Sequence, residues 1–383
     1  MDPQHRTEMI QHGNEGTLPQ LVKRYERMHE LYPQLPYFTA RLGDLFRYMG
    51  AESLAVFYYR QAKDDLYELG DDDEVLDNLV LELGMQAYNQ AVHDANTARL
   101  AGPYSEPWKP TALHEFPSGL PFPHGHEELL AKWTKSKNSD SVLSERYLRR
   151  TAIDSNQLES IFLLTKESSD DLTLSGLGDA IPVHCQPLSS ITESPKIKQI
   201  LKDMLDTYEV VFNIAENQKP ISPDFVTQIH KGFMDTCRFI GETCYVTTGI
   251  TRAETLKTVV IRGERDHPIQ LCPYGDVTKE LNYICNAMNI NMPLKWKNPF
   301  AAASWIYLVL IRCHPFEDGN GRLTRMIASL PLIQHGYPPI SISLSLQEEC
   351  QRAIGRAYIG DHSALMGVLF KGMRQTLEQV EAL

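Results

Sequence analysis

The stretch that decides the fold reads His314, Pro315, Phe316, Glu317, Asp318, Gly319, Asn320, Gly321, Arg322, Leu323, Thr324 and Arg325. A helix is predicted to enter it, because Asn298 can cap that helix, Pro299 suits its first position, and residues 300–313 are apolar without a breaker. A second helix is predicted to leave it over residues 320–336, with a bend or a lost hydrogen bond at Pro331. We therefore expect a turn between two buried helices.

The chemistry of this turn predicts an anion site. Arg322 and Arg325 stand near the start of a helix, where a positive side chain opposes the helix dipole unless an anion binds there. The backbone N–H groups of Gly319, Asn320 and Gly321 would point out of the helix start and form a nest for a polyphosphate.

Two further side chains of the stretch suit transfer of a phosphate group. Asp318 could hold a divalent cation against the phosphates, and His314 lies within reach as a general base. Taken singly, each residue also fits a plain helix start with a capping aspartate and solvated arginines. The combination favours the anion site.

All twelve positions match the motif H-x-F-x-[D/E]-G-N-G-R-x-x-R of Fic-domain proteins. We identify residues 144–383 as similar to that family. The resemblance implies transfer of AMP from ATP to a protein hydroxyl, with His314 as the base and Asp318 as the Mg²⁺ ligand. It further implies that Arg322 grips the β- and γ-phosphates and that Phe316 anchors the loop.

The resemblance also implies that four further residues bind the phosphates: Gly319, Asn320, Gly321 and Arg325. Members of the family also place an aromatic residue against adenine, and Tyr358 stands at about that position. The expected cofactors are ATP and Mg²⁺, with Mn²⁺ as an alternative metal.

A second motif of the family, [S/T]-x-x-x-E-[G/N], fits Ser155 and Glu159, but Ser160 departs from it. The resemblance implies that this glutamate pairs with Arg325 and blocks the γ-phosphate position. Glu159 and the phosphate would compete for one buried arginine, so a low intrinsic activity is expected. The alternative is an ordinary exposed glutamate on a helix.

The segment upstream resembles one tetratricopeptide repeat. Small and large residues fall at the spacing of two packed helices, and these are Leu42, Gly43, Phe46, Gly50, Ala55, Tyr59 and Ala62. Such a unit would bind a protein partner or act as a helical scaffold that binds nothing. We predict a disordered N-terminus over 1–16, the repeat-like domain over 17–101, a proline-rich linker over 102–143 that lies on the core, and the Fic domain over 144–383.

A small β-hairpin is predicted ahead of the catalytic helices. Thr247 and Thr248 precede Gly249, and Thr258, Val259, Val260 and Ile261 precede Gly263, which suggests two short strands. In the family such a flap pairs with an extended target segment, and residues 258–261 resemble its second strand. A plain structural hairpin is the alternative. Mid-helix His230 is predicted to be packed or hydrogen-bonded rather than catalytic.

Composition narrows the partners and the compartment. The formal charge of −12 makes nonspecific binding to nucleic acid or to an anionic membrane unfavourable. Seven scattered cysteines without metal-ligand spacing predict reduced thiols. We expect a cytoplasmic protein; a nuclear location stays open, and a secretory one would require a longer chain. A homodimer also stays open.

The sequence thus predicts a mainly α protein with a Fic core, a small hairpin flap and a preceding repeat-like domain. Its expected activity is AMP transfer to Ser, Thr or Tyr hydroxyls of protein substrates, held back by Glu159, which could also assist removal of AMP. Transfer of phosphate or phosphocholine is one alternative, and an ATP-binding repeat scaffold without catalysis is another.

Overall fold

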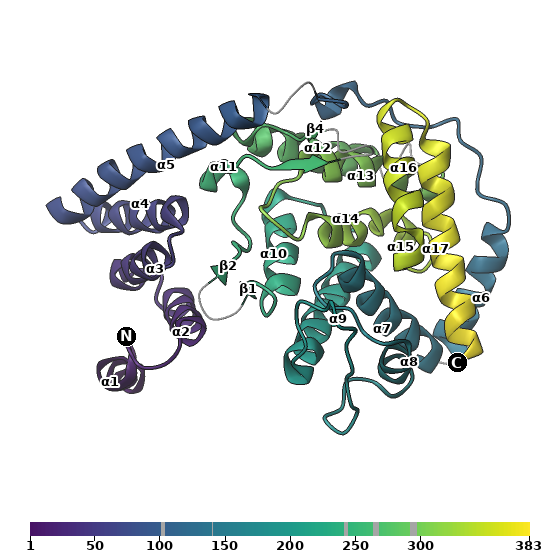
Figure 1. Ribbon diagram of the computed structural model, residues 1–383, viewed down its shortest axis with the longest axis horizontal. Coiled ribbons are helices and arrows are strands. Elements are labelled where there is room, and N and C mark those ends of the chain that lie inside the picture. Colours follow the sequence, from purple (N-terminus) through teal and green to yellow (C-terminus); the bar gives the residue numbers. More distant parts are fainter. Residues whose placement is uncertain (101–103, 140, 241–243, 263–267, 292–296) are drawn as a thin grey trace. The chain divides into compact units, whose positions relative to one another are not determined.

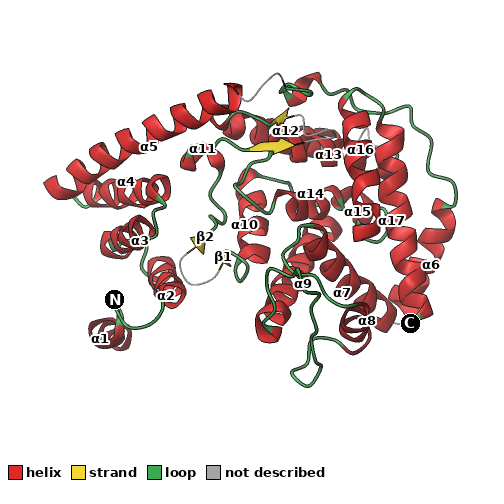
Figure 2. Cartoon of the chain, in the orientation of Figure 1, coloured by secondary structure: helices red, strands yellow, loops and turns green. Residues whose placement is uncertain are grey.

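A computed structural model describes residues 1–100, 104–139, 141–240, 244–262, 268–291 and 297–383. The chain divides into two compact units (Figure 1). The N-terminal unit comprises Met1–Pro103 and Arg238–Val259, and the C-terminal unit comprises Tyr104–Cys237 and Val260–Leu383. The chain therefore passes from one unit to the other three times. Almost every element is a helix and the strands are short, which confirms the predicted mainly α class with a small hairpin (Figure 2).

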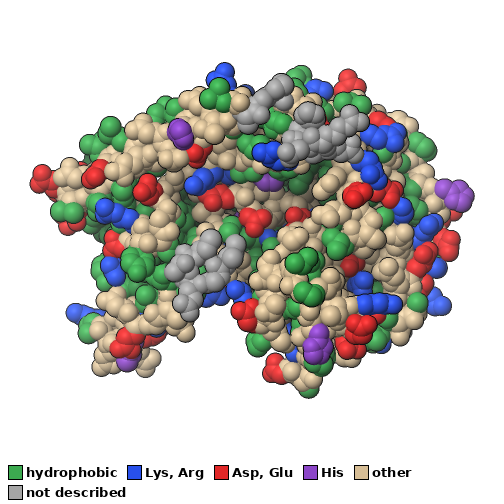
Figure 3. Space-filling view, viewed as in Figure 1, with side chains coloured by type: hydrophobic (Ala, Val, Ile, Leu, Met, Phe, Trp, Pro, Cys, Tyr) green, Lys and Arg blue, Asp and Glu red, His purple; other side chains and the backbone are tan. Residues whose placement is uncertain are grey.

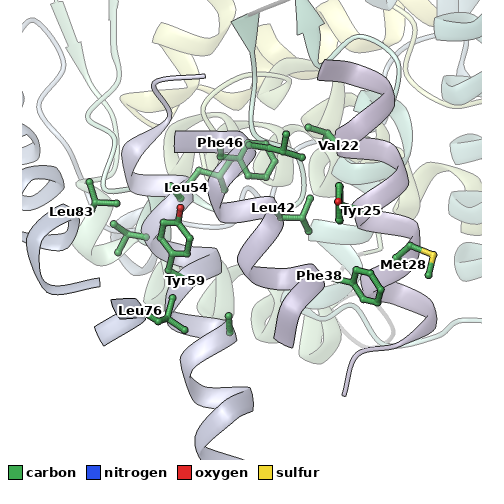
Figure 4. Packing of buried hydrophobic residues seen from close by; sticks show 14 of the residues in the cluster. Val22, Tyr25, Met28, Phe38, Leu42, Phe46, Leu54, Tyr59, Leu76 and Leu83 are labelled. Atoms are coloured by element: carbon green, nitrogen blue, oxygen red, sulfur yellow. The ribbon is translucent and has the colours of Figure 1, made fainter. Parts of the chain in front are cut away.

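The N-terminal unit is built on a stack of antiparallel helices. Its elements are α1 (Pro3–His12), α2 (Leu18–Leu31), α3 (Pro36–Tyr48), α4 (Glu52–Glu68), α5 (Glu74–Leu100), β1 (Phe239–Ile240), β2 (Cys244–Tyr245) and α11 (Arg252–Thr255). The residues predicted to lie between the repeat helices are buried, except Gly50, which has φ +72° where α3 turns into α4. Side chains from four helices meet in one apolar core (Figure 4).

A close approach of α3 to α4 depends on Gly43. A Cβ atom at this position would lie 2.6 Å from the ring of Tyr59. The ring cannot easily retreat, because its hydroxyl donates to Oδ1 of Asp44 over 2.7 Å. The small residue of the repeat pattern thus lets two helices touch, as the sequence predicted.

Residues 1–16, predicted to be disordered, instead contain α1. The prediction missed a capped start: the side chain of Asp2 accepts from the N–H of Gln4, and Pro3 occupies the first helical position. Tyr32, the residue after α2, contacts this helix, since its hydroxyl lies 2.8 Å from Nδ1 of His5. A tertiary contact therefore supports a segment whose composition alone favoured disorder.

Residues 238–259 belong to the N-terminal unit, although the sequence placed them in a continuous domain over 144–383. Both terminal nitrogens of Arg238 donate to the carboxylate of Glu26, each over 2.7 Å. Phe239 joins the core of the helix stack, and the ring of Tyr245 lies 4.8 Å from that of Phe46. The predicted boundary was wrong because these contacts connect residues some 200 positions apart, as the pair Arg238–Glu26 shows with a separation of 212.

The C-terminal unit holds the predicted helix–turn–helix at its centre. Its elements are α6 (His126–Ser139), α7 (Ser141–Leu158), α8 (Lys166–Ser175), α9 (Ser194–Glu216), α10 (Pro223–Met234), β3 (Val260–Arg262), β4 (Pro268–Gln270), α12 (Val277–Asn291), α13 (Pro299–Cys313), α14 (Asn320–Ala328), α15 (Leu330–Gln334), α16 (Gln347–Tyr358) and α17 (His362–Ala382). Within the described residues, single turns of 3-10 helix accompany them at Thr111–Leu113, Tyr274–Asp276 and Leu344–Leu346.

The two predicted helices around the turn are confirmed as α13 and α14. Asn298 caps α13 by accepting from the N–H groups of Phe300 and Ala301. Fourteen residues of α13 are buried, which explains why this helix is apolar on every side. Pro331 breaks the predicted second helix, so that α14 ends at Ala328 and α15 continues from Leu330.

The proline-rich segment packs on the C-terminal unit, as predicted. Nη1 of Arg312 donates to Glu106 over 2.6 Å, and the N–H of Thr111 donates to Glu280 over 2.9 Å. The indole of Trp305 donates to the carbonyl of His114. Side chains of the core thus satisfy the backbone of a segment that has no ladder of its own.

The predicted hairpin strands were partly wrong. Thr258 and Val259 precede β3, which begins at Val260 and pairs antiparallel with β4. Residues 258–261 therefore lead into and begin the first strand of this hairpin, and they do not form the second strand. Thr247 and Thr248 are buried in the N-terminal unit and lie in no strand. The turn predicted at Gly263 lies outside the described residues.

Two findings bear on the environment of the chain. Among the described residues, no helix is long and apolar enough to cross a membrane. The six cysteines whose side chains the structure describes are free thiols, five of them buried. Cys244 lies outside this set.

The packing of Gly43 generates a prediction. Gly43→Ala should lower the free energy of unfolding by about 1–3 kcal/mol, because the added methyl meets a held ring. Far-UV circular dichroism during urea denaturation measures this. Gly84→Ala on α5 is the matched control: its nearest neighbour is the flexible end of Arg60 at 3.3 Å, so it should gain up to about 1 kcal/mol from helix propensity. Equal effects of both substitutions would contradict the packing argument.

Candidate active site

His314 is the C-cap residue of α13 and opens the turn that follows. Its φ is +47°, a left-handed conformation that closes the helix and that a residue other than glycine adopts at some cost. Nδ1 lies 3.3 Å from the carbonyl of Ile311. Since a carbonyl only accepts, Nδ1 carries the proton of the neutral ring, and the lone pair lies on Nε2. Nε2 is therefore the nitrogen that can accept a proton from a substrate.

Asn320 closes the loop through its side chain. Its Oδ1 accepts from the N–H of Phe316 over 3.0 Å, and its Nδ2 donates to the carbonyl of Phe316 over 2.8 Å. This two-way pairing satisfies the loop backbone in a buried place. The amide of Asn320 thus shapes the loop, and only its backbone N–H remains for a ligand.

The loop rests on His230 of α10. The rings of His230 and Phe316 stack with centroids 3.7 Å apart and planes 4° from parallel. Nε2 of His230 donates to the carbonyl of Asp318 over 3.0 Å. Burial lowers the pKa of His230 to about 3, so the ring is neutral at physiological pH. The predicted structural role of His230 is confirmed, and it consists of supporting the loop.

Gly319 provides the left-handed start of α14. Its φ is +75°, and a Cβ there would lie 2.9 Å from Sδ of Met234 and 3.0 Å from Nε2 of His230. Its N–H donates to Oδ1 of Asp318 over 2.6 Å. The carboxylate of Asp318 stays 47% exposed, with Oδ2 3.9 Å from Arg322. A side chain at position 319 would displace the support of the loop, so only glycine fits.

Arg322 is wholly buried and poorly partnered. Its Nη1 lies 3.3 Å from Oδ1 of Asn156 and 3.2 Å from Sγ of Cys237, and its Nη2 lies 3.1 Å from Sδ of Met234. Its Nε has no hydrogen-bond partner among the described residues. Sulfur and a long amide contact compensate a buried guanidinium weakly. Arg322 therefore retains capacity to bind an anion.

Arg325 is buried against the end of α7. Its Nε donates to Oγ of Ser155 over 2.8 Å, and its Nη2 donates to the carbonyl of Ser155 over 3.0 Å and to Oε1 of Glu159 over 2.7 Å. Burial acts to lower the pKa of Arg325, but the Glu159 carboxylate, with Tyr307 and Tyr208, acts in the opposite direction and the pKa is raised. The structure thus brings together Ser155, Glu159 and Arg325, which the sequence paired.

Glu159 also covers the first turn of α14. A Cβ on Gly321 would lie 2.0 Å from Oε1 of Glu159. A carboxylate therefore already stands against the helix start where the sequence predicted an anion, at a place that glycine keeps open.

Comparison with known proteins identifies the domain. Residues 220–332, from just before α10 into α15, match the Fic/DOC family. This part of the chain is similar to a Fic domain. A Fido domain-containing protein of Dictyostelium discoideum is 34% identical over 73 residues, which are 19% of this chain and 51% of that protein. The protein adenylyltransferase fic-1 of Caenorhabditis elegans is 31% identical over 64 residues, which are 17% of this chain and 13% of that protein.

The likeness to these relatives is partial. This chain spans about half the length of the Dictyostelium protein and a smaller part of the Caenorhabditis protein. A Fic domain-containing signaling protein from Bacteroides thetaiotaomicron has a crystal structure that is 15% identical, with a TM-score of 0.51, covering 67% of this chain and 96% of that one. That similarity shows a common fold.

Ser160 departs from the second motif, and the backbone at this position shows why the motif prefers Gly or Asn there. Ser160 has φ +56° and follows the last turn of α7, where its N–H donates to the carbonyl of Gln157 and the N–H of Ile161 donates to the carbonyl of Asn156. This left-handed position suits the Gly or Asn that the motif prefers. Serine adopts it with some strain, directly after the glutamate that pairs with Arg325.

Tyr358 lies among residues of the proline-rich segment. Its hydroxyl donates to the carbonyl of Pro107, and the guanidinium of Arg312 lies 4.5 Å from its ring centroid. His114 and Lys109 also approach this ring. No described contact joins Tyr358 to the α14 loop, so its part in nucleotide binding stays a prediction.

Sequence reasoning missed the residues that hold Arg322. Asn156, Met234 and Cys237 come from α7 and from the end of α10. Asn156 is the residue after Ser155, so the second motif offered a hint. Met234 and Cys237 read as ordinary core positions, and nothing in the sequence distinguishes them.

The buried ring of His230 generates a prediction about pH. An unfolded histidine has a pKa of about 6.5, so between about pH 6.5 and 3 the unfolded chain binds a proton that folded His230 does not. Stability is therefore lost as the pH falls through this window, by about 1.4 kcal/mol per pH unit for this residue. His230→Phe keeps a flat ring on Phe316 and removes this term.

Urea denaturation at several pH values measures the effect. The variant should be less stable near pH 7, by roughly 1 kcal/mol for the lost hydrogen bond to Asp318, and its stability should fall less steeply on acidification. An unchanged slope would show that His230 does not titrate as its burial implies.

Proposed function

We propose that this protein transfers AMP from ATP to Ser, Thr or Tyr hydroxyls of other proteins, and that Glu159 holds the activity back. The observation that carries the proposal is the 2.7 Å ion pair between Arg325 and Glu159 beside the start of α14. A carboxylate on a buried arginine at a helix start marks a site built for an anion. Relatives named protein adenylyltransferase support AMP as the transferred group.

His314 supplies the base in this proposal. The hydroxyl oxygen of the target attacks the α-phosphorus of ATP, pyrophosphate leaves, and the hydroxyl proton passes to Nε2 of His314. Since Nδ1–H donates to Ile311, Nε2 is held as the acceptor. A positioned base of this kind contributes about 10²–10⁴-fold to a rate.

The phosphates would lie on the start of α14. The backbone N–H groups of Gly319, Asn320 and Gly321 form the nest, and Arg322 and Arg325 supply charge. Asp318 suits Mg²⁺, because magnesium usually takes one or two protein carboxylates with substrate phosphates, and this carboxylate is exposed beside the nest. Bound Mg²⁺ would neutralise phosphate charge, and Mn²⁺ could replace it.

Glu159 and the γ-phosphate would compete for Arg325. Removing one member of a buried ion pair leaves an unpaired charge and costs about 3–5 kcal/mol. When the Glu159 carboxylate leaves Arg325, bound ATP must therefore place its own negative charge on that arginine. Only a nucleotide with its γ-phosphate on Arg325 restores the lost charge pair. The resting enzyme is therefore expected to be slow.

Self-labelling with ATP tests the proposal. Glu159→Gly should take up label from the α-phosphate about tenfold faster or more than wild type, because a competition of about 1.4 kcal/mol already changes a rate tenfold. Label at the γ-phosphate should stay in solution. His314→Ala combined with Glu159→Gly should remove the uptake, and Glu145→Ala, on the exposed face of the same helix, should behave as wild type.

The outcomes separate the rival functions. Uptake of γ-label would indicate phosphate transfer, and uptake of neither label by a variant that still binds ATP would indicate a scaffold without catalysis. Chasing the labelled variant with excess wild type examines removal of AMP, in which Glu159 would orient water through its second carboxylate oxygen. Label that persists through the chase would argue against removal.

We also propose that the target docks on β3. This strand pairs with β4 on one edge. On its far side β4 accepts a hydrogen bond from the N–H of Ser105 at Pro268 and donates one from Gln270 to the carbonyl of Glu106. In the part of the chain that the structure describes, no strand pairs with the other edge of β3. Thr258 and Val259 lie directly ahead of this edge. An extended target segment could pair with Val260 and Ile261 through main-chain hydrogen bonds.

Proline substitutions test this docking. Proline placed at Val260, Ile261 and Arg262 in turn should lower AMP transfer to acceptor proteins of a cell lysate, most at positions whose N–H faces away from β4. Val260→Thr is the control, since it changes a side chain and keeps the N–H. Nucleotide binding should be unaffected throughout. Equal transfer by all variants would rule out main-chain pairing at this edge.

A further inference from the structure

α5 carries a second apolar face that packs on nothing in the described chain. One face is buried through small and apolar residues, which are Leu76, Leu83, Ala87, Ala91 and Ala98. The other presents what we term the outer stripe: Leu81, Met85, Tyr88 and Val92, exposed by 65%, 60%, 58% and 38%. Hydrophobic side chains are visible at the surface along α5 (Figure 3). Exposed apolar stripes of this kind mark interaction sites.

The spacing of the outer stripe is that of a coiled-coil seam. Its members are separated by four, three and four residues, and the same alternation extends outward. On one side it reaches Asn78 and then Glu74. On the other it reaches Ala95 and then Arg99. The seam therefore covers 26 residues of one helix, or about 38 Å at 1.5 Å per residue.

The pattern of apolar and charged residues along the seam is symmetric about the bond between Gln86 and Ala87. Turned end for end, the seam places Leu81 over the position of Val92 and Met85 over that of Tyr88. Its two ends carry opposite charge, Glu74 at the start and Arg99 at the finish. Such a surface is complementary to itself when two copies run antiparallel, which is the requirement of a two-fold interface.

We propose that a second copy of this chain packs antiparallel on the outer stripe to form a two-fold dimer. Leu81 would contact Val92 of the partner subunit, and Met85 would contact Tyr88 of the partner subunit. Glu74 would face Arg99 of the partner subunit at each end. A parallel pair would instead set glutamate against glutamate and arginine against arginine, which is unfavourable. Four apolar positions make a short seam, so the dimer is concentration-dependent.

Sedimentation equilibrium of the full chain tests the proposal. Wild type should shift from monomer to dimer as its concentration rises through the micromolar range. Leu81→Glu with Met85→Glu should stay monomeric at concentrations where wild type is dimeric, since both side chains are exposed and their replacement spares the core. Leu113→Glu with Leu188→Glu is the matched control, because these leucines are 60% and 86% exposed on the other unit and should leave the dimer intact.

Charge reversal determines the orientation of the pair. Glu74→Arg and Arg99→Glu should each weaken the dimer several-fold, because each creates two repelling contacts, and the two together should restore it. A monomeric wild type, an unaffected Leu81→Glu and Met85→Glu variant, or a double reversal that fails to restore association would overturn the proposal. A monomer that instead captures a basic helical peptide on the outer stripe would assign the stripe to another protein. These measurements do not depend on AMP transfer.

Discussion

The structure depends on how the positive charge of two buried arginines is compensated. Arg322 and Arg325 enter the interior on α14, and each needs an anion or a dipole to compensate the loss of water. Arg325 has Glu159 and Ser155 at hydrogen-bond distance, whereas Arg322 has sulfur atoms, one amide and the half-exposed carboxylate of Asp318 at 3.9 Å. The asymmetry is informative: one arginine is satisfied by the chain, and the other is left with unused capacity. A ligand that brings several negative charges would correct this imbalance.

The compensation of Arg325 comes from the least regular part of α7. Glu159 lies one residue beyond the end of α7 at Leu158, with its side chain 30% exposed, and Ser160 adopts a left-handed backbone. The remainder of that helix end, including Asn156, is buried. Release of the carboxylate therefore requires movement of a helix terminus and a single side chain. It does not require the core to open.

Local chemistry was predictable from the sequence, and long-range pairing was not. The cap at Asn298, the break at Pro331 and the pairing of Arg325 with Glu159 all follow from short patterns or from the family motif. The partner of β3 and the support of the loop by His230 depend on contacts between distant segments. Their residues look like common strand and core positions. No periodicity or composition distinguishes a histidine that supports this loop from one in any other core.

The chain passes between its two units three times. This limits how the protein can be altered by deleting or exchanging one part. Residues 238–259 lie in the middle of the Fic sequence, yet Arg238 pairs with Glu26 and Phe239 fills the helix stack. Removing the first hundred residues would leave this segment without its core and would bring Phe239 and Tyr245 into water. The helix stack is thus no detachable accessory. Evolution could replace it only together with residues 238–259. A fragment that begins at the proline-rich linker would keep those residues and expose their apolar side chains.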